Sequence, residues 1–162
     1  MIKLIIYYEL SDYSQELQAA HVNATDRAGY QAYQGVLPTE PFKELYFMDK
    51  AKRFLQEIKD VPLIYVGGVQ SGDNCQQIMD EGFELFQIAH VLIKDPDFVK
   101  HVQDNPHYHA GCGRSNYCVG RMYSKEMKCH ECVERDGEVI APRIKKEIAK
   151  LERDAELSNR GK

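Results

Sequence analysis

The stretch that decides the fold is VPLIYVGGVQSGDNCQQIMDEGFELFQIAHVLIKDP, residues 61–96. A nearly continuous apolar run at 61–66 and a second run at 83–89 are typical of strands that are buried on both faces of a parallel sheet. Between the two runs, Ser71 is suited to cap a helix and Gly82 is suited to end it. The stretch therefore predicts a strand, helix, strand unit whose first strand opens into a double glycine.

The flanking segments continue this alternation of strands and helices. Residues 2–10 are apolar and β-branched enough for a strand, and 11–41 hold the glycines and prolines of a long loop. Apolar residues at three- and four-residue steps predict an amphipathic helix over 41–59. Pro96 suits the first position of a short helix over 97–103. The predicted order is therefore β, loop, α, β, α, β, α.

Two of the predicted helices carry a stripe of apolar side chains. In the helix capped by Ser71, the residues expected on one face are Cys75, Ile78 and Met79. Cys75 is accordingly expected in the core. In the charged helix that Pro142 opens, the residues expected on one face are Ile144, Ile148 and Leu151. We expect this second stripe to pack on the outside of the same domain.

The composition is typical of a single soluble domain, with 162 residues of which 43% are hydrophobic and 28% are charged. The formal net charge of -4 argues against nucleic acid as a partner, because phosphate contacts need clustered Lys and Arg. Glu9 interrupts the apolar start before it reaches the length of a signal peptide or a membrane span, so no membrane contact and a cytoplasmic location are expected. The five cysteines are then expected as reduced thiols or metal ligands rather than disulfides.

The double glycine is a candidate phosphate site. A strand that ends in two glycines lets backbone N–H groups approach an anion, because no Cβ is in the way. The pattern is neither the dinucleotide fingerprint nor a P-loop, and a Gly-Gly pair also occurs simply as a turn. In (β/α)8 barrels, however, the phosphate site is commonly built from the loops after strands seven and eight. Two successive predicted strands end here in small residues, at Gly67-Gly68 and at Ala89.

These segments resemble a known family. The segment VPLIYVGGV, followed by a helix ending in DEGFELFQIAHVLIKDPDFVKHV, is similar to the last two βα units of the Old Yellow Enzyme type NADH:flavin oxidoreductases, which are related to 2,4-dienoyl-CoA reductase. The segment CGRSNYCVGRMYSKEMKC resembles the cysteine-bearing segment C-x-x-C-N-x-C of that family. The resemblance covers residues 39–133, and KLIIYYELS is more loosely similar to the sixth strand of the barrel.

The resemblance implies an α/β fold, namely the C-terminal part of a TIM (β/α)8 barrel with about the last three βα units, a Cys-containing segment and a C-terminal helix. The implied divisions are partial barrel units at 1–104, a Cys- and His-containing segment packed on the barrel at 105–133, and a charged helical tail at 134–162. A closed barrel needs roughly 250 residues, so the resemblance leads us to expect this chain without the first five units, and no catalytic residue is assigned. Because exposed sheet edges drive association, self-association or pairing with a complementary barrel chain is expected.

The same resemblance implies FMN as cofactor and NAD(P)H as co-substrate, used for hydride transfer to an activated alkene or another small-molecule electrophile. The implied flavin phosphate site is the backbone around Gly67, Gly68, Val69, Ala89 and His90. The Gly-Arg of the family is Ala89-His90 here, and a neutral imidazole is a poor substitute for a bidentate guanidinium. The alternative is a barrel fragment without catalysis, or an interaction module stabilised by zinc. Whether the chain is an enzyme on its own stays open.

The cysteine segment has three interpretations. Ser115 stands where a second family cysteine would be, and the spacing before Cys118 is one residue short of the cluster form, which argues against a 4Fe-4S cluster. A zinc site would use four thiolates, those of Cys112, Cys118, Cys129 and Cys132. The third interpretation is that the reduced cysteines pack as small apolar groups. The histidines without a partner visible in the sequence, expected on the surface, are His101, His107 and His109.

Overall fold

The structure is a computed structural model that describes residues 37–38, 40–122 and 125–160. By their contacts the described residues divide into two units, one of residues 43–112 and one of residues 37–42 and 113–160. The strand predicted at residues 2–10 lies outside the described residues, as does most of the loop predicted at residues 11–41.

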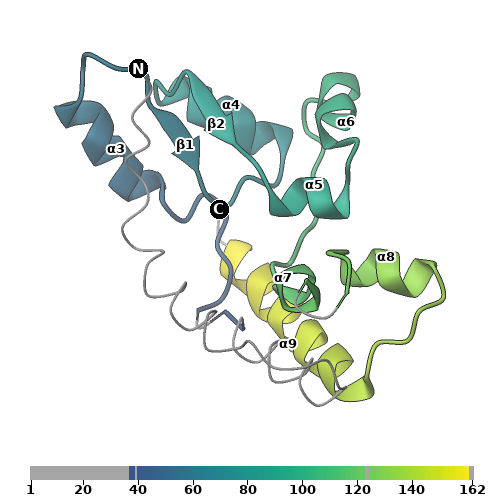
Figure 1. The fold of residues 1–162 in the computed structure, drawn as a ribbon. Helices are drawn as coiled ribbons and strands as arrows, with labels where there is room; N and C mark the ends of the chain where they lie inside the picture. The colour runs from purple at the N-terminus through teal and green to yellow at the C-terminus, as the bar shows by residue number, and fades with distance from the viewer. Residues whose placement is uncertain (1–36, 39, 123–124, 161–162) are drawn as a thin grey trace. The chain divides into compact units, whose positions relative to one another are not determined.

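The first unit holds a two-stranded parallel sheet and four helices among its described residues (Figure 1). In chain order these are α3 (Met48–Glu57), β1 (Ile64–Val66), α4 (Gly72–Asp80), β2 (Leu85–Gln87), α5 (His90–Lys94) and α6 (Phe98–Asp104). The strands pair in register, Ile64 with Leu85, Tyr65 with Phe86 and Val66 with Gln87. The predicted strand, helix, strand unit with parallel strands is therefore confirmed, with strands shorter than predicted. The prediction that both strands are buried on both faces is wrong for β2, in which Leu85 is 50% exposed and Gln87 is also exposed. That these elements are part of a TIM barrel stays a prediction.

Helix α4 begins and ends where the sequence predicts. The Ser71 hydroxyl oxygen accepts a hydrogen bond at 3.1 Å from the backbone N–H three residues on. Gly82 follows the helix with a φ of +100°, the left-handed conformation that glycine adopts at helix ends. The predicted apolar face is wrong in one member, because Ile78 is fully buried and Cys75 half-buried whereas Met79 is 45% exposed. A helix turns about 100° per residue, which carries Met79 away from the buried side.

Two other helices begin later than predicted. Helix α3 starts at Met48 rather than near residue 41, because Leu45 has a φ of +53° that no α-helix accommodates. The Leu45 N–H instead donates a hydrogen bond to the Gly68 carbonyl oxygen at 3.1 Å. In α6, Asp97 is the N-cap, so Pro96 precedes the helix rather than opening it. Both starts are set by turns that come before the helical pattern.

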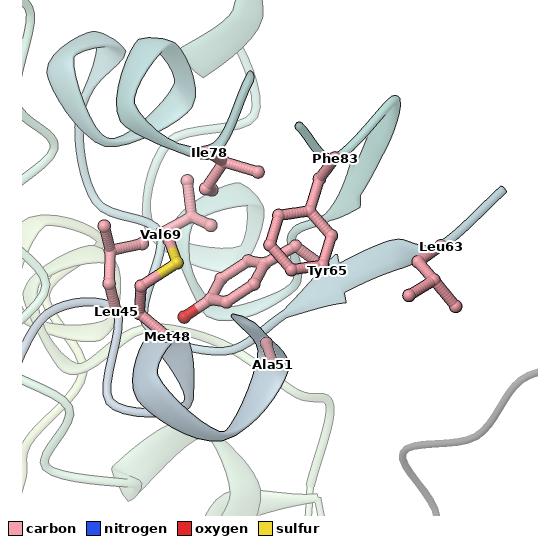
Figure 2. Packing of buried hydrophobic residues seen from close by; sticks show 8 residues of the cluster. All are labelled: Leu45, Met48, Ala51, Leu63, Tyr65, Val69, Ile78 and Phe83. Carbon is pink, nitrogen blue, oxygen red and sulfur yellow. The ribbon is translucent and has the colours of Figure 1, made fainter. Parts of the chain in front are cut away.

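The core of the first unit centres on Tyr65. Its side chain is fully buried, its hydroxyl donates to the Gly67 carbonyl oxygen at 2.8 Å, and burial raises its pKa. The ring contacts Phe83 edge-on, with ring centroids 5.5 Å apart. Figure 2 shows the Tyr65 ring in the middle of an apolar cluster whose other members are Leu45, Met48, Ala51, Leu63, Val69, Ile78 and Phe83. The core therefore joins α3, β1 and α4 to the loop that carries the glycine pair.

The second unit is helical in its described residues. Its helices are α7 (Tyr117–Arg121), α8 (His130–Arg135) and α9 (Pro142–Asn159). Pro142 opens α9 as predicted, and of the predicted stripe Ile144 and Ile148 pack within the second unit, where Ile148 is 4% exposed and contacts Tyr117 and Val119. Helices α7 and α8 form in the cysteine segment, where the sequence predicted no regular element. Among the described helices, none has the length and apolarity needed to cross a bilayer.

Candidate functional site

The residues predicted to bind phosphate lie at one edge of the two-stranded sheet. Residues 67–69 follow β1, and residues 89–90 follow β2. Because the strands are parallel neighbours with Val66 opposite Gln87, both loops leave the sheet at its carboxyl edge, where ligands bind in α/β folds. The structure thus brings the two predicted loops to the same edge. Phosphate binding by them stays a prediction.

The glycine pair is required by the close approach of the segment before α3. Gly67 and Gly68 have φ values of +120° and +73°. A Cβ on Gly67 would lie 2.8 Å from the Phe47 ring, and a Cβ on Gly68 would lie 2.6 Å from the Leu45 backbone nitrogen. The Tyr46 ring lies against both glycines. The pair therefore has a packing role that is independent of any ligand and that the sequence did not indicate.

Two backbone N–H groups of this loop form no hydrogen bond in the described part of the chain, and one of them belongs to Val69, which is 5% exposed. Among the described residues, the N–H groups of Gly68 and Val69 donate to no acceptor. The first turn of α4 is different, because the Gly72 N–H donates to the Tyr108 carbonyl oxygen at 2.9 Å and the Ser71 hydroxyl caps the helix. The glycine loop therefore offers two unengaged N–H groups at this edge, whereas in the first turn of α4 the N–H of Asp73 is the one that lacks an acceptor among the described residues.

Residues 108–112, here called the strap, run antiparallel to residues 70–72, which directly follow the glycine loop of residues 67–69. The Gln70 side chain, 2% exposed, donates through Nε2 to the Cys112 carbonyl oxygen and accepts through Oε1 from the Cys112 N–H, both at 3.0 Å. Ser71 and His109 form an antiparallel bridge beside this pair. The first cysteine of the predicted metal set is thereby held next to the candidate phosphate loop.

Glu44 joins the strap to α4. Its Oε2 accepts a hydrogen bond from Asn74 Nδ2 at 2.9 Å, and its Oε1 lies 3.1 Å from His109 Nε2. His109 Nδ1 accepts from the Gly111 N–H at 3.0 Å, so the ring proton is on Nε2 and is donated to Glu44. This carboxylate therefore connects the segment before α3, the helix α4 and the strap.

A second carboxylate, Asp95, organises the turn between α5 and α6. Its Oδ2 accepts from the Tyr108 hydroxyl at 2.9 Å and lies 2.9 Å from His101 Nδ1. Burial raises the pKa of Asp95, but the hydrogen bonds from His101 and Tyr108 outweigh that effect and hold its pKa below the usual value. The three histidines for which the sequence shows no partner each pair with a carboxylate: His101 with Asp95, His107 with Asp73 and His109 with Glu44. Their side chains lie at the surface, as predicted.

The predicted thiolate set is divided between the two units. Cys112 belongs to the first unit, and the other members of the set, Cys118, Cys129 and Cys132, belong to the second. No disulfide joins the described cysteines. Burial raises the pKa of the Cys75 thiol, which packs against both apolar clusters of the first unit as predicted for a core residue. A zinc site of four thiolates stays a prediction, as does the packing of these thiols as small apolar groups.

The second unit gathers a group of side chains that the sequence did not indicate. His130 Nε2 lies 2.8 Å from Glu152 Oε1, and with a carboxylate oxygen of Glu131 these ligand atoms lie within 4.8 Å of one another. His130 and Glu131 lie on α8 whereas Glu152 lies on α9, so no regular spacing connects them. The nearest signal in the sequence is the C-x-x-C that encloses His130 and Glu131.

Comparison with known proteins finds an enzyme of the reductase class among the curated proteins similar to this chain. No protein-family model matches the chain, and no solved structure matches it. Among curated proteins, the chain is similar to a reductase, which is an oxidoreductase. That relative is the 4,4'-dithiodibutanoate disulfide reductase of Rhodococcus erythropolis, 34% identical over 111 residues, which are 67% of this chain and 26% of the relative. The chain therefore spans about a quarter of the length of the curated relative that it matches.

Proposed function

We propose that this chain supplies the phosphate-binding end of a flavin-dependent oxidoreductase. The observation that carries the proposal is the loop of residues 67–69 at the carboxyl edge of a parallel sheet, where the N–H groups of Gly68 and Val69 have no acceptor within the described part of the chain. The similarity to a disulfide reductase supports the redox class. The flavin itself follows from the resemblance of the glycine and cysteine segments to NADH:flavin oxidoreductases.

The residues of this chain would bind and orient the phosphate of FMN. The N–H groups of Gly68 and Val69 would donate to phosphate oxygens, and charge-assisted hydrogen bonds of this kind are among the stronger ones in proteins. His90 occupies the position of the family arginine and offers a single imidazole in place of a planar fork of donors. The strap holds Gln70, the residue that directly follows this loop, through two hydrogen bonds. When bound, FMN would carry electrons from NAD(P)H to the substrate.

The substrate class we propose is an organic disulfide. The relative is named for the reduction of such a compound, 4,4'-dithiodibutanoate. An activated alkene, which the sequence resemblance implies, is the alternative substrate. In either case the ring-binding residues and the proton donor would come from the remaining barrel units, supplied by a complementary barrel chain or by self-association.

A second interpretation rests on the packing of the glycine pair. Residues 45–47 already fill the space beside both glycines, so the pair has a reason to exist without a ligand. In that case the chain is a barrel part without a flavin site, or an interaction module stabilised by zinc. Flavin binding separates the two interpretations.

The experiment compares FMN with riboflavin, which lacks the phosphate, by quenching of flavin fluorescence at micromolar protein, while light scattering reports the mass of the protein. We expect FMN to bind at least about tenfold more tightly than riboflavin, because one hydrogen bond to a charged group is worth about 1.5–3 kcal/mol. Equal affinity for the two flavins, or no binding of FMN, would refute a phosphate site on this chain.

A pair of variants at Ala89 tests the location of the phosphate. Ala89 is the exposed N-cap of α5, a position at which Asp and Asn are both favoured, so neither variant should disturb folding. Ala89→Asp is expected to weaken FMN binding through charge repulsion and to leave riboflavin binding unchanged, while Ala89→Asn is the neutral control. Equal FMN affinity of the two variants would place the phosphate elsewhere.

A further inference from the structure

We propose that His130, Glu131 and Glu152 form a binding site for a divalent transition metal, with Zn²⁺ as the expected occupant. The site lies within the second unit. It shares no residue with the candidate flavin site or with the four cysteines predicted from the sequence. The proposal therefore goes beyond the proposed function and does not depend on it.

The spacing of the three ligand atoms suits a small cation. In a tetrahedral zinc site with bonds of about 2.0–2.1 Å, neighbouring ligand atoms lie about 3.3 Å apart. His130 Nε2 and Glu152 Oε1, at 2.8 Å, need to separate only slightly from their present hydrogen bond. The third ligand atom, from Glu131, lies within 4.8 Å of the other two and needs to approach by at most about 1.5 Å. Rotation of a glutamate side chain covers that distance without a change of backbone.

The neighbours of two of these side chains fix their positions. The ring of Tyr117 contacts the ring of His130 edge-on, at 6.3 Å between centroids and 88° between planes. The aliphatic stem of Glu152 packs against Gly113, where a Cβ would lie 2.6 Å from Glu152 Cγ. The side chains of His130 and Glu152 are 14% and 35% exposed, and Glu131 is at the surface. His130 and Glu152 are therefore held in position by their neighbours, and the exposed Glu131 lies on the side from which an ion would enter.

The donor set selects the class of metal. Calcium and magnesium prefer oxygen ligands throughout, whereas zinc readily takes an imidazole nitrogen together with carboxylate oxygens. Three protein ligands leave a fourth position of the zinc for water. The two carboxylates balance the charge of a divalent ion, and the ion relieves their mutual repulsion.

Metal binding would join two helices. His130 and Glu131 lie on α8, and Glu152 lies on α9. A ligand that binds only the folded chain raises its thermal midpoint, by about 5–10 °C for a chain of this size when the free ligand exceeds its Kd a hundredfold. Zinc is therefore expected to raise the unfolding temperature of the full chain by this amount.

The test uses the full chain after removal of metals with a chelator. Zinc affinity is measured by competition with a chromophoric chelator, and stoichiometry by elemental analysis after dialysis. We expect the native chain to bind one zinc ion. Glu152→Gln and Glu131→Gln should each bind zinc at least tenfold more weakly and should lose it on dialysis. Glu152→Gln keeps an oxygen acceptor for His130, and Glu131 is exposed, so both variants should fold. Glu134→Gln is the matched control on α8, because the Glu134 carboxylate pairs with Lys145 instead.

Cobalt distinguishes this site from one made of thiolates. Co²⁺ bound to the native chain is expected to show the spectrum of nitrogen and oxygen ligands, without a thiolate-to-cobalt charge-transfer band. The proposal is overturned if the native chain binds no zinc, if Glu152→Gln and Glu131→Gln bind it as tightly as the native chain does, or if the bound cobalt shows only thiolate ligation.

Discussion

Replacement of Gly68 by alanine is expected to destabilise the first unit much more than the same replacement at Gly82. Both glycines have left-handed φ values, +73° and +100°, so both variants incur backbone strain of about 1–2 kcal/mol. At Gly82 no atom of the described residues lies within 4 Å of the added Cβ, whereas at Gly68 that atom would lie 2.6 Å from the backbone nitrogen of Leu45. Since the Leu45 N–H also donates to the Gly68 carbonyl oxygen, a shift that relieves the clash breaks this hydrogen bond.

The size of the difference follows from these contacts. Overpacking against backbone costs about 1–3 kcal/mol, and the lost hydrogen bond costs about 1 kcal/mol. Added to the strain, these make the expected loss of unfolding free energy about 3–6 kcal/mol for Gly68→Ala, against about 1–2 kcal/mol for Gly82→Ala.

Urea denaturation followed by far-UV circular dichroism measures both losses. The midpoint should fall in each variant while the m-value stays constant, because the surface exposed on unfolding is nearly the same. The reasoning is refuted if the two variants lose the same free energy, since the close approach of Leu45 to the glycine loop would then contribute nothing to stability.

Two further predictions concern the polar side chains that hold the strap and the turn before α6. Because the pKa of Asp95 is held below its unfolded value of about 3.9, its contribution to stability is present above that value and is lost as the pH falls through the folded pKa. Tyr108→Phe removes one of the responsible hydrogen bonds, so the acid side of a stability-against-pH curve should become flatter, and an unchanged curve would contradict this role. Gln70→Ala leaves the Cys112 backbone without its partner at a cost of about 1–3 kcal/mol and should speed amide hydrogen exchange in the strap. The control is Gln76→Ala, at an exposed residue. Equal amide exchange rates in the two variants would show that the hydrogen bonds between Gln70 and Cys112 do not hold the strap.

The sequence predicts those elements whose causes are local. The Ser71 cap, the Gly82 stop and the Pro142 start all act within about one helical turn, and each is found in the structure. The late start of α3 has a different cause, because the left-handed conformation of Leu45 accompanies its hydrogen bond to Gly68, which is distant in the sequence. Pattern alone does not show such a contact.

The candidate site likewise has parts that local sequence predicts and parts that depend on contacts between distant residues. The glycine loop and the place of Ala89 could be located from the sequence, because parallel strands that end in small residues form a recognisable pattern. The side chains that support the loop could not, since Gln70 and Cys112 are 42 positions apart and each is an ordinary residue in its own segment. The same holds for His130 and Glu152, which meet across two helices and are separated by 22 positions. Long-range polar pairs of this kind require coordinates.

The strap also has a mechanical consequence. The chain passes from the first unit to the second directly after Cys112. Tension along the chain from that side would therefore reach first the two hydrogen bonds that Gln70 makes with the Cys112 backbone. Because one amide group makes both bonds, they share the load in parallel. Behind them lie the antiparallel hydrogen bonds from Ala110 to Gln70 and from Gly72 to Tyr108, which a pull from this end would open one after another. The strap would thus peel away in steps and protect β1 and its parallel partner from the first part of any extension.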